Sequence, residues 1–119
     1  MSQDGAFVIH HNPNCGTSRN VLQMIRDSGR EPVVNRYLET GWTRAKLEQL
    51  LAAMGKRPRD ILRVRNTPAE ELGLLKPGVP DETILAAMQE HPALVERPIV
   101  ETPKGVRLCR PAETVRELL

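Results

Sequence analysis

One cysteine near the N-terminus stands in a setting that favours nucleophilic chemistry. Cys15 follows a short apolar run and is succeeded by Gly16, Thr17 and Ser18, residue types that are common in turns and at helix starts. A helix N-terminus presents free backbone N–H groups and a partial positive charge, so it lowers the pKa of a thiol placed there. These residues also fit a close approach of the backbone to an anion. We therefore predict a reactive Cys15 in an anion-binding loop, with a buried cysteine that merely starts a helix as the plainer alternative.

Two neighbours of this cysteine limit its chemistry. His11 lies four residues earlier at the end of the apolar run, and if protonated it could stabilise the thiolate; otherwise it is a solvated histidine at a strand end. His10 should point to the opposite face of the strand, and we assign it a structural role. Ser18 occupies the position at which a C-x-x-C motif carries its second cysteine, which argues against an ordinary dithiol oxidoreductase. The second thiol must then come from elsewhere.

Arginines are the other candidates for chemistry. Arg63 follows a short helical segment, Arg97 precedes a proline before a strand, and Arg110 follows the last strand. The planar guanidinium group suits a tetrahedral oxyanion, and several arginines beside a thiolate would also stabilise the charge that develops during attack. The alternative for any one of them is an arginine on the surface in a solvated ion pair.

The elements that must position these residues follow from apolar periodicity. Runs bounded by turn residues predict strands at 6–10, 32–37, 99–102 and 106–109. Apolar residues three and four positions apart predict helices that start after Cys15, after the cap residue Thr43, at Asp81 and at Pro111, with short helical turns near 58–62 and 68–73. The order β-α-β, helical block, β-β-α is that of an α/β thioredoxin-like fold with a mixed sheet. We expect one domain, 1–119, with a helical insertion at about 43–92.

Composition excludes several classes of function. The 119 residues carry 17 Lys+Arg and 15 Asp+Glu, and the resulting net charge of +2 gives no support for nucleic-acid binding. Two cysteines and three histidines are too few for a structural zinc site. No apolar run is long enough to span a membrane, and the polar start of the chain lacks the apolar region of a signal peptide. We therefore expect a cytoplasmic protein without a metal.

Several strings of residues together resemble a known family. They are H-N-P-N-C-G-T-S-R-N at 11–20, Y-L-E-T at 37–40, E-E-L-G at 70–73, H-P at 91–92, R-P-I-V at 97–100 and R-L-C-R-P at 107–111. With these strings the sequence resembles the glutaredoxin-linked ArsC family of arsenate reductases. The resemblance runs from the first predicted strand to the last helix, and it implies a thioredoxin-like fold with a helical insertion.

The resemblance also implies a set of site residues. The catalytic cysteine of the family matches Cys15, and the histidine proposed to help ionise it matches His11. The oxyanion-binding arginines match Arg63, Arg97 and Arg110. Arg65 brings a further positive charge close to Arg63, and the match of positions selects Arg63. Arg107 and Cys109 lie in the matching strings without a catalytic role.

A reaction sequence comes with that resemblance. The Cys15 thiolate attacks the arsenic of arsenate and displaces water. Glutathione, the co-substrate, then attacks the adduct, and electrons pass to arsenic. Glutaredoxin removes the glutathione and arsenite leaves. The family needs no metal and no bound organic cofactor.

Other functions remain open from sequence. A glutathione-dependent thiol–disulfide reductase of the same superfamily would use Cys15 but would need no arginine site. A transcriptional regulator of the Spx type, which binds RNA polymerase, commonly carries a C-x-x-C switch that Ser18 interrupts. Phosphate resembles arsenate in shape and charge, but we identify no general acid that would serve its hydrolysis.

Overall fold

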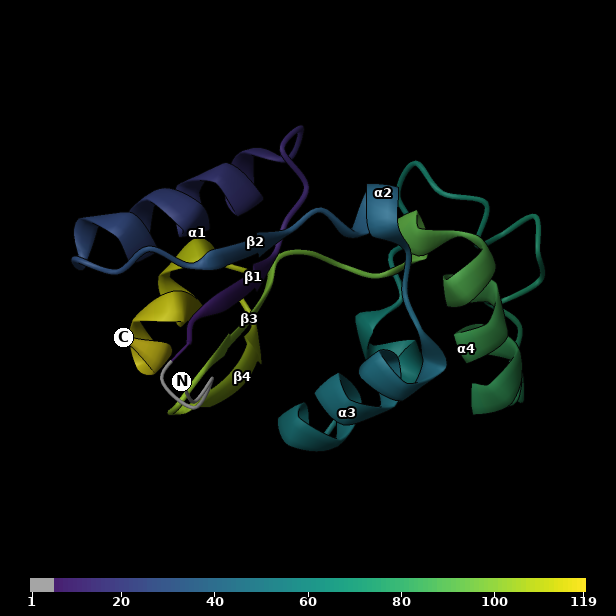
Figure 1. Ribbon diagram of the computed structural model, residues 1–119. Coiled ribbons are helices and arrows are strands. Elements are labelled where there is room, and N and C mark those ends of the chain that lie inside the picture. Colours follow the sequence, from purple (N-terminus) through teal and green to yellow (C-terminus); the bar gives the residue numbers. More distant parts are fainter. Residues whose placement is uncertain (1–5) are drawn as a thin grey trace. The chain divides into compact units, whose positions relative to one another are not determined.

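A computed structural model describes residues 6–119 and divides them into two compact units. The first unit consists of residues up to Thr40 together with Arg97–Leu119, and the second is Gly41–Glu96 (Figure 1). The predicted insertion at 43–92 lies within the second unit, and the assignment of one domain to the whole chain stays a prediction. The polar residues 1–5, on which the cytoplasmic expectation partly rests, lie outside the described residues.

A mixed four-stranded sheet forms the centre of the first unit. Its strands are β1 (Val8–His10), β2 (Val33–Asn35), β3 (Ile99–Thr102) and β4 (Gly105–Leu108), in the order β2-β1-β3-β4. β1 runs parallel to β2, while β1–β3 and β3–β4 are antiparallel pairs. The α/β class, the mixed sheet and all four strands are confirmed. β1 and β2 are shorter than the apolar runs that predict them, β3 has the predicted bounds, and β4 lies one residue earlier than predicted.

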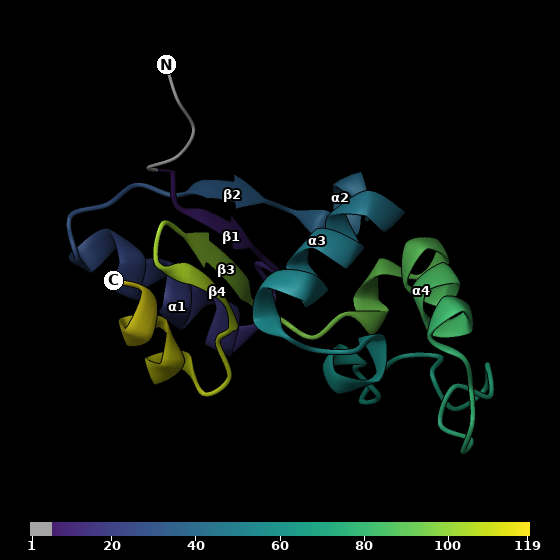
Figure 2. The same ribbon diagram turned by 90° about the horizontal axis from the view of Figure 1, so that it is seen from below.

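Two helices of the first unit pack together with the sheet. α1 (Gly16–Asp27) contacts η3 (Ala112–Leu118), a 3-10 helix where the apolar pattern predicts a short helix at the end of the chain (Figure 2). Ile9 of β1 and Val100 of β3 are register partners and face these helices. The buried cluster contains Phe7, Ile9, Val21, Ile25, Val100, Cys109, Val115 and Leu118. Burial of each large side chain stabilises the unit by about 1.5–3 kcal/mol, so this cluster fixes the position of the loop that enters α1.

The opposite face of the sheet carries a polar row. His10 is buried, and its Nε2 lies 2.7 Å from the carboxylate of Glu101 on β3. Its Nδ1 lies 2.9 Å from the amide nitrogen of Asn35 on β2, whose Oδ1 accepts a hydrogen bond of 3.0 Å from the Thr40 hydroxyl. Thr40 ends α2 (Tyr37–Thr40), a four-residue helix too short for periodicity to reveal. The contacts of His10 agree with the structural role predicted for it.

The second unit is helical. It contains α3 (Arg44–Met54), η1 (Pro58–Ile61), α4 (Asp81–Glu90) and η2 (Pro92–Leu94). Thr43 caps α3 by accepting the Lys46 N–H at 3.1 Å, and Gly55 ends that helix in the left-handed conformation with φ 67°, both as predicted. Residues 68–73 form the predicted single turn, in which the Leu72 N–H donates to the Pro68 carbonyl at 2.9 Å.

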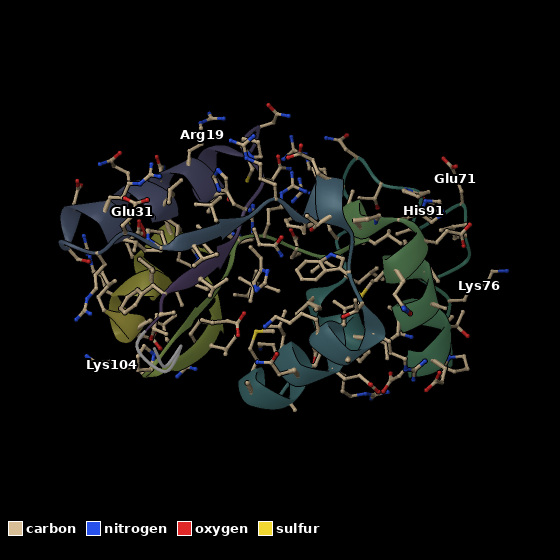
Figure 3. The ribbon with its side chains drawn as sticks, in the orientation of Figure 1. Arg19, Glu31, Glu71, Lys76, His91 and Lys104 are labelled. Carbon is tan, nitrogen blue, oxygen red and sulfur yellow. The ribbon has the colours of Figure 1, made fainter. Side chains whose placement is uncertain are left out.

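Charged side chains cover the surface of each unit. Arg19, Glu31, Glu71, Lys76 and Lys104 are all exposed (Figure 3). Positive and negative groups are therefore solvated in both units, in keeping with the nearly balanced charge. Within residues 6–119, none of the helices has the length and apolar character needed to cross a membrane.

Candidate active site

The loop before α1 is folded by its own hydrogen bonds. The Asn12 side chain accepts the Asn14 N–H at 2.9 Å, and the Asn12 carbonyl accepts the Cys15 N–H at 3.0 Å. Cys15 then takes an extended conformation as the N-cap residue of α1 and is 9% exposed. The polar sequence Asn12–Asn14 thus turns the chain from β1 into α1 and leaves the sulfur at the helix N-terminus, as predicted.

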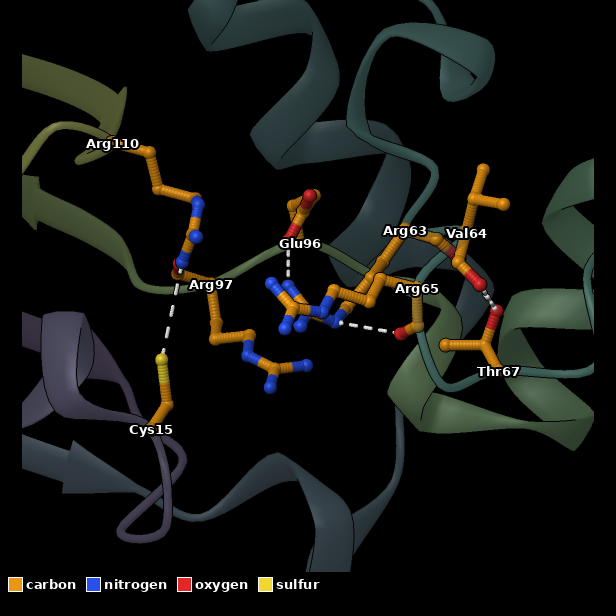
Figure 4. A network of polar contacts seen from close by, with 8 residues as sticks. All are labelled: Cys15, Arg63, Val64, Arg65, Thr67, Glu96, Arg97 and Arg110. Carbon is orange, nitrogen blue, oxygen red and sulfur yellow. Dashed lines mark hydrogen bonds and ion pairs between the residues drawn. The ribbon is translucent and has the colours of Figure 1, made fainter.

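Two arginines from the other end of the chain lie at this sulfur. The Nη1 of Arg110 is 3.9 Å from the Cys15 Sγ and donates to the Arg97 carbonyl at 3.1 Å (Figure 4). The Arg97 guanidinium also acts on this thiol, since its hydrogen bonding and its positive charge lower the pKa of Cys15. The fold therefore brings together three of the predicted site residues, although Cys15 is more than 80 positions away from either arginine in the chain.

Opposing effects set the acidity of Cys15. Burial raises the pKa of the thiol, but hydrogen bonds from the Arg97 guanidinium and the Ser18 backbone N–H lower it. The positive charge of Arg97 and a hydrogen bond from Arg110 lower it further, and the net result is a pKa below that of an ordinary cysteine. The thiolate is thus available at lower pH, which is the property of a nucleophilic cysteine.

One hydrogen-bond donor beside Cys15, the buried Nε of Arg97, is unpaired among residues 6–119. A buried donor of this kind is costly to leave unpaired, and a bound group with an acceptor oxygen would satisfy it. The site beside Cys15 is therefore suited to an oxyanion.

His11 contacts Ser18. Its Nδ1 lies 2.6 Å from the Ser18 Oγ, which also accepts the Asn12 backbone N–H at 3.1 Å. Burial lowers the pKa of His11, and the charges of Arg36, Arg26 and Arg19 lower it further. The imidazole is therefore neutral near pH 7, so protonation, the condition attached to its predicted role, is disfavoured there. The contact with Ser18 ties His11 to the first turn of α1.

Gly16 and Thr17 open α1 immediately after the cysteine. A Cβ atom at Gly16 would meet only the Arg19 side chain, at 3.8 Å, which is an ordinary contact. The glycine is therefore not required by crowding within the chain. With the N–H of Ser18 already at the sulfur, these residues form the helix start that the sequence predicts.

Arg63 belongs to the second unit. Its Nη1 lies 2.8 Å from the Glu96 carboxylate, and its Nε donates to the Arg65 carbonyl at 3.2 Å (Figure 4). Thr67 closes the same turn by donating its hydroxyl to the Arg63 carbonyl at 2.7 Å. The side chain of Arg65 is exposed, so of these two arginines Arg63 is the one held in place. The sequence does not single out Glu96, because its partner Arg63 lies 33 positions away in the chain.

The sequence of this chain matches a known protein family. The family model described as "ArsC family" matches residues 10–118, which is nearly the whole chain. The chain belongs to the ArsC family. A curated relative, Arsenate reductase ArsI1 from Synechocystis, is 55% identical over 98% of this chain and 81% of its own length. Arsenate reductase from Escherichia coli strain K12 is 53% identical over 95% of this chain and 80% of its own.

Solved structures of the ArsC family have the same fold. A structure described as arsenate reductase from Vibrio cholerae matches with a TM-score of 0.91 and 38% identity, covering 97% of this chain and 98% of that one. The thioredoxin-like fold predicted from the order of elements is thereby confirmed.

Cys109 lies in a different environment from Cys15. It is fully buried in the apolar cluster of the first unit. Burial raises its pKa to about 12, and the charge of Glu117 contributes in the same direction. This thiol stays protonated and unreactive at neutral pH. In residues 6–119, no group of three or more His, Cys, Asp or Glu is arranged to hold a metal ion.

The contrast between the two cysteines gives a direct prediction. With iodoacetamide at pH 7, the folded ArsC-family protein should be alkylated at Cys15 and not at Cys109, as peptide mass spectrometry would reveal. Cys109→Ala should leave the alkylation rate of Cys15 unchanged and lower the stability by about 1 kcal/mol through lost packing. Denatured protein, in which both thiols should react, is the control. Comparable modification of Cys109 in the folded protein would contradict its assignment as a buried core residue.

Proposed function

We propose that this protein reduces arsenate to arsenite at Cys15. The observation that carries the proposal is the pair Arg97 and Arg110 at a thiol of lowered pKa, with the buried Nε of Arg97 unpaired among residues 6–119. The relatives named arsenate reductases support the choice of arsenate among tetrahedral oxyanions. A plain thiol–disulfide reductase would have no use for such an arginine pair.

In the proposed first step, arsenate binds beside the sulfur. Arg97 and Arg110 donate hydrogen bonds to its oxygens, and Arg63 is the third arginine by its match to the family motif. The Cys15 thiolate attacks arsenic, an As–S bond forms, and one oxygen leaves as water after taking up protons. The arginines stabilise the negative charge that accumulates during attack. His11 acts as a positioning residue, because it holds the Ser18 hydroxyl while the Ser18 N–H contacts the sulfur.

In the proposed second step, glutathione supplies the other thiol. The reduction of As(V) to As(III) takes two electrons, which two thiols provide as they become a disulfide. Cys109 is a poor second thiol because it is buried and its pKa is about 12. Glutathione therefore attacks the adduct, and arsenite leaves as Cys15 and glutathione become disulfide-linked. A glutaredoxin thiolate then takes the glutathione and frees Cys15. These partners fit a cytoplasmic enzyme.

A coupled assay tests this proposal. With glutathione, glutaredoxin, glutathione reductase and NADPH present, NADPH oxidation should depend on arsenate and on every component of the mixture. Replacing the glutathione components by thioredoxin and thioredoxin reductase should reduce the rate to the background. Activity with only thioredoxin and thioredoxin reductase would refute glutathione and glutaredoxin as the source of electrons. Reduction of a small disulfide without any arsenate turnover would overturn arsenate as the substrate.

A further inference from the structure

The pair formed by Arg63 and Glu96 in the second unit is shielded from solvent. The Arg63 Nη1 and the Glu96 Oε1 are 2.8 Å apart, and their side chains are only 11% and 25% exposed. Three exposed ion pairs of this unit are different: the side chains of Arg44 and Glu82 are 39% and 70% exposed, those of Arg57 and Asp81 are 70% and 41% exposed, and those of Arg44 and Glu48 are 39% and 54% exposed. Solvent screens those pairs and leaves them with little energetic effect, whereas a shielded pair has a strong mutual influence.

The backbone holds the two members of the pair beside each other. Leu62 and Val95 form an isolated antiparallel bridge. On its two sides the Arg63 N–H donates to the Leu94 carbonyl at 2.7 Å, and the Glu96 N–H donates to the Ile61 carbonyl at 2.9 Å. The two backbone hydrogen bonds thus hold the main chain of Arg63 beside that of Glu96, while the Glu96 carboxylate and the Arg65 carbonyl hold the guanidinium. A long, flexible side chain is thereby reduced to one arrangement.

The contacts divide the guanidinium of Arg63 into occupied and unoccupied parts. Nε is used by the Arg65 carbonyl and Nη1 by Glu96. Across residues 6–119, the contacts of the Arg63 side chain do not include a partner for Nη2. This nitrogen keeps its donors for another acceptor. The Glu96 carboxylate at the same time places a negative charge next to the group that would bind an oxyanion, and like charges oppose each other there.

We propose that Glu96 is a positioning residue for Arg63 that also weakens oxyanion binding by its charge. The inference rests on the proposed function, because it takes Arg63 as a ligand of arsenate. Glu96 fixes the guanidinium by one edge and leaves Nη2 for the oxyanion. Its negative charge also partly neutralises the charge of Arg63. The protein therefore binds arsenate less tightly than it would without the Glu96 carboxylate.

Two variants separate the hydrogen bond from the charge. Glu96→Gln keeps an acceptor for Arg63 and removes the charge, so the KM for arsenate should fall about threefold to tenfold with kcat within about twofold. Glu96→Ala removes both, and its KM should exceed that of Glu96→Gln because Arg63 is no longer fixed. Glu82→Gln breaks an exposed ion pair in the same unit and should leave KM unchanged. In an Arg63→Ala background, Glu96→Gln should have no further effect on KM.

A binding measurement gives a readout besides turnover. In Glu96→Gln the shielded Arg63 charge is uncompensated until an anion binds, so sodium arsenate should raise the Tm of this variant more than that of the parent protein. The same titration detects folding, since a variant that fails to fold shows no transition.

The outcomes distinguish this inference from the proposed function. If Arg63→Ala raises KM but Glu96→Gln leaves both KM and the arsenate-induced Tm shift unchanged, the role of Glu96 is refuted and the enzyme assignment stands. If the parent protein does not turn over arsenate, the proposed function fails. A larger Tm shift in Glu96→Gln would then still support Glu96 as a modulator of oxyanion binding, and equal shifts would refute both.

Discussion

Replacement of Cys15 by serine should abolish arsenate reduction, with a loss of at least about a thousandfold in kcat. Serine keeps the shape of the side chain, but its hydroxyl does not ionise near neutral pH and cannot give up electrons to arsenic. The hydrogen bonds from Arg97 and the Ser18 N–H, which stabilise a thiolate, have no anion to stabilise in this variant. The coupled assay with NADPH measures the loss.

Two controls make that result specific. Cys109→Ala removes the other thiol and should retain nearly full turnover, since Cys109 is buried in the apolar cluster. Sodium arsenate should still raise the Tm of Cys15→Ser, because the arginines that bind it are unchanged. Substantial turnover by Cys15→Ser would remove Cys15 from the proposed chemistry.

Replacement of Arg97 by alanine should lower kcat/KM for arsenate by about a hundredfold to a thousandfold. Arg97 lowers the pKa of Cys15 and contributes the unpaired Nε, so its loss affects both nucleophile and substrate. Burial raises the pKa of Cys15, and Arg97 opposes this effect. Removal of the guanidinium should therefore raise the pKa of the thiol. Alkylation of Cys15 by iodoacetamide should be slower than in the parent protein at pH 7 and approach the parent rate at high pH.

An arginine of the same unit provides the matched control. Arg107 is exposed and pairs with Glu117 at 3.4 Å. Arg107→Ala should leave both the kinetics and the pH profile of alkylation unchanged. Arg97→Lys should show an intermediate loss, because lysine keeps the charge without the planar fork. An alkylation profile of Arg97→Ala that coincides with that of the parent protein would refute its influence on the thiol.

Elements with strong local signals could be predicted from sequence. The Thr43 cap and the Gly55 stop delimit α3 correctly, since capping depends on residues within one helical turn. The four strands are predictable because their apolar runs lie between turn residues. The four residues of α2 are too few to show a helical period, so the sequence does not predict this helix. The end of the chain forms the 3-10 helix η3, and the apolar pattern alone does not separate this helix type from an α-helix.

The sequence indicates which residues form the candidate site better than it indicates the contacts between them. Cys15 stands out by its local sequence, and Arg97 and Arg110 by the family strings, but the approach of Arg110 to the sulfur depends on the pairing of β3 with β4. The charge state of His11 was not readable from sequence, because its pKa depends on burial and on arginines from several elements. Glu96 was missed for a similar reason, since its partner Arg63 lies 33 positions away.

The polar row across β2, β1 and β3 affects the register in which these strands pair. Apolar pairs such as Ile9 with Val100 tolerate exchange of one aliphatic neighbour for another, and so discriminate weakly between alignments two residues apart. Asn35, His10 and Glu101 are complementary only in one alignment, because a shift of β2 or β3 against β1 separates the buried imidazole of His10 from Asn35 or from Glu101. These three residues thus favour one register of β2 and β3 against β1. Because the loop that carries Cys15 follows β1, the same contacts determine where that loop begins.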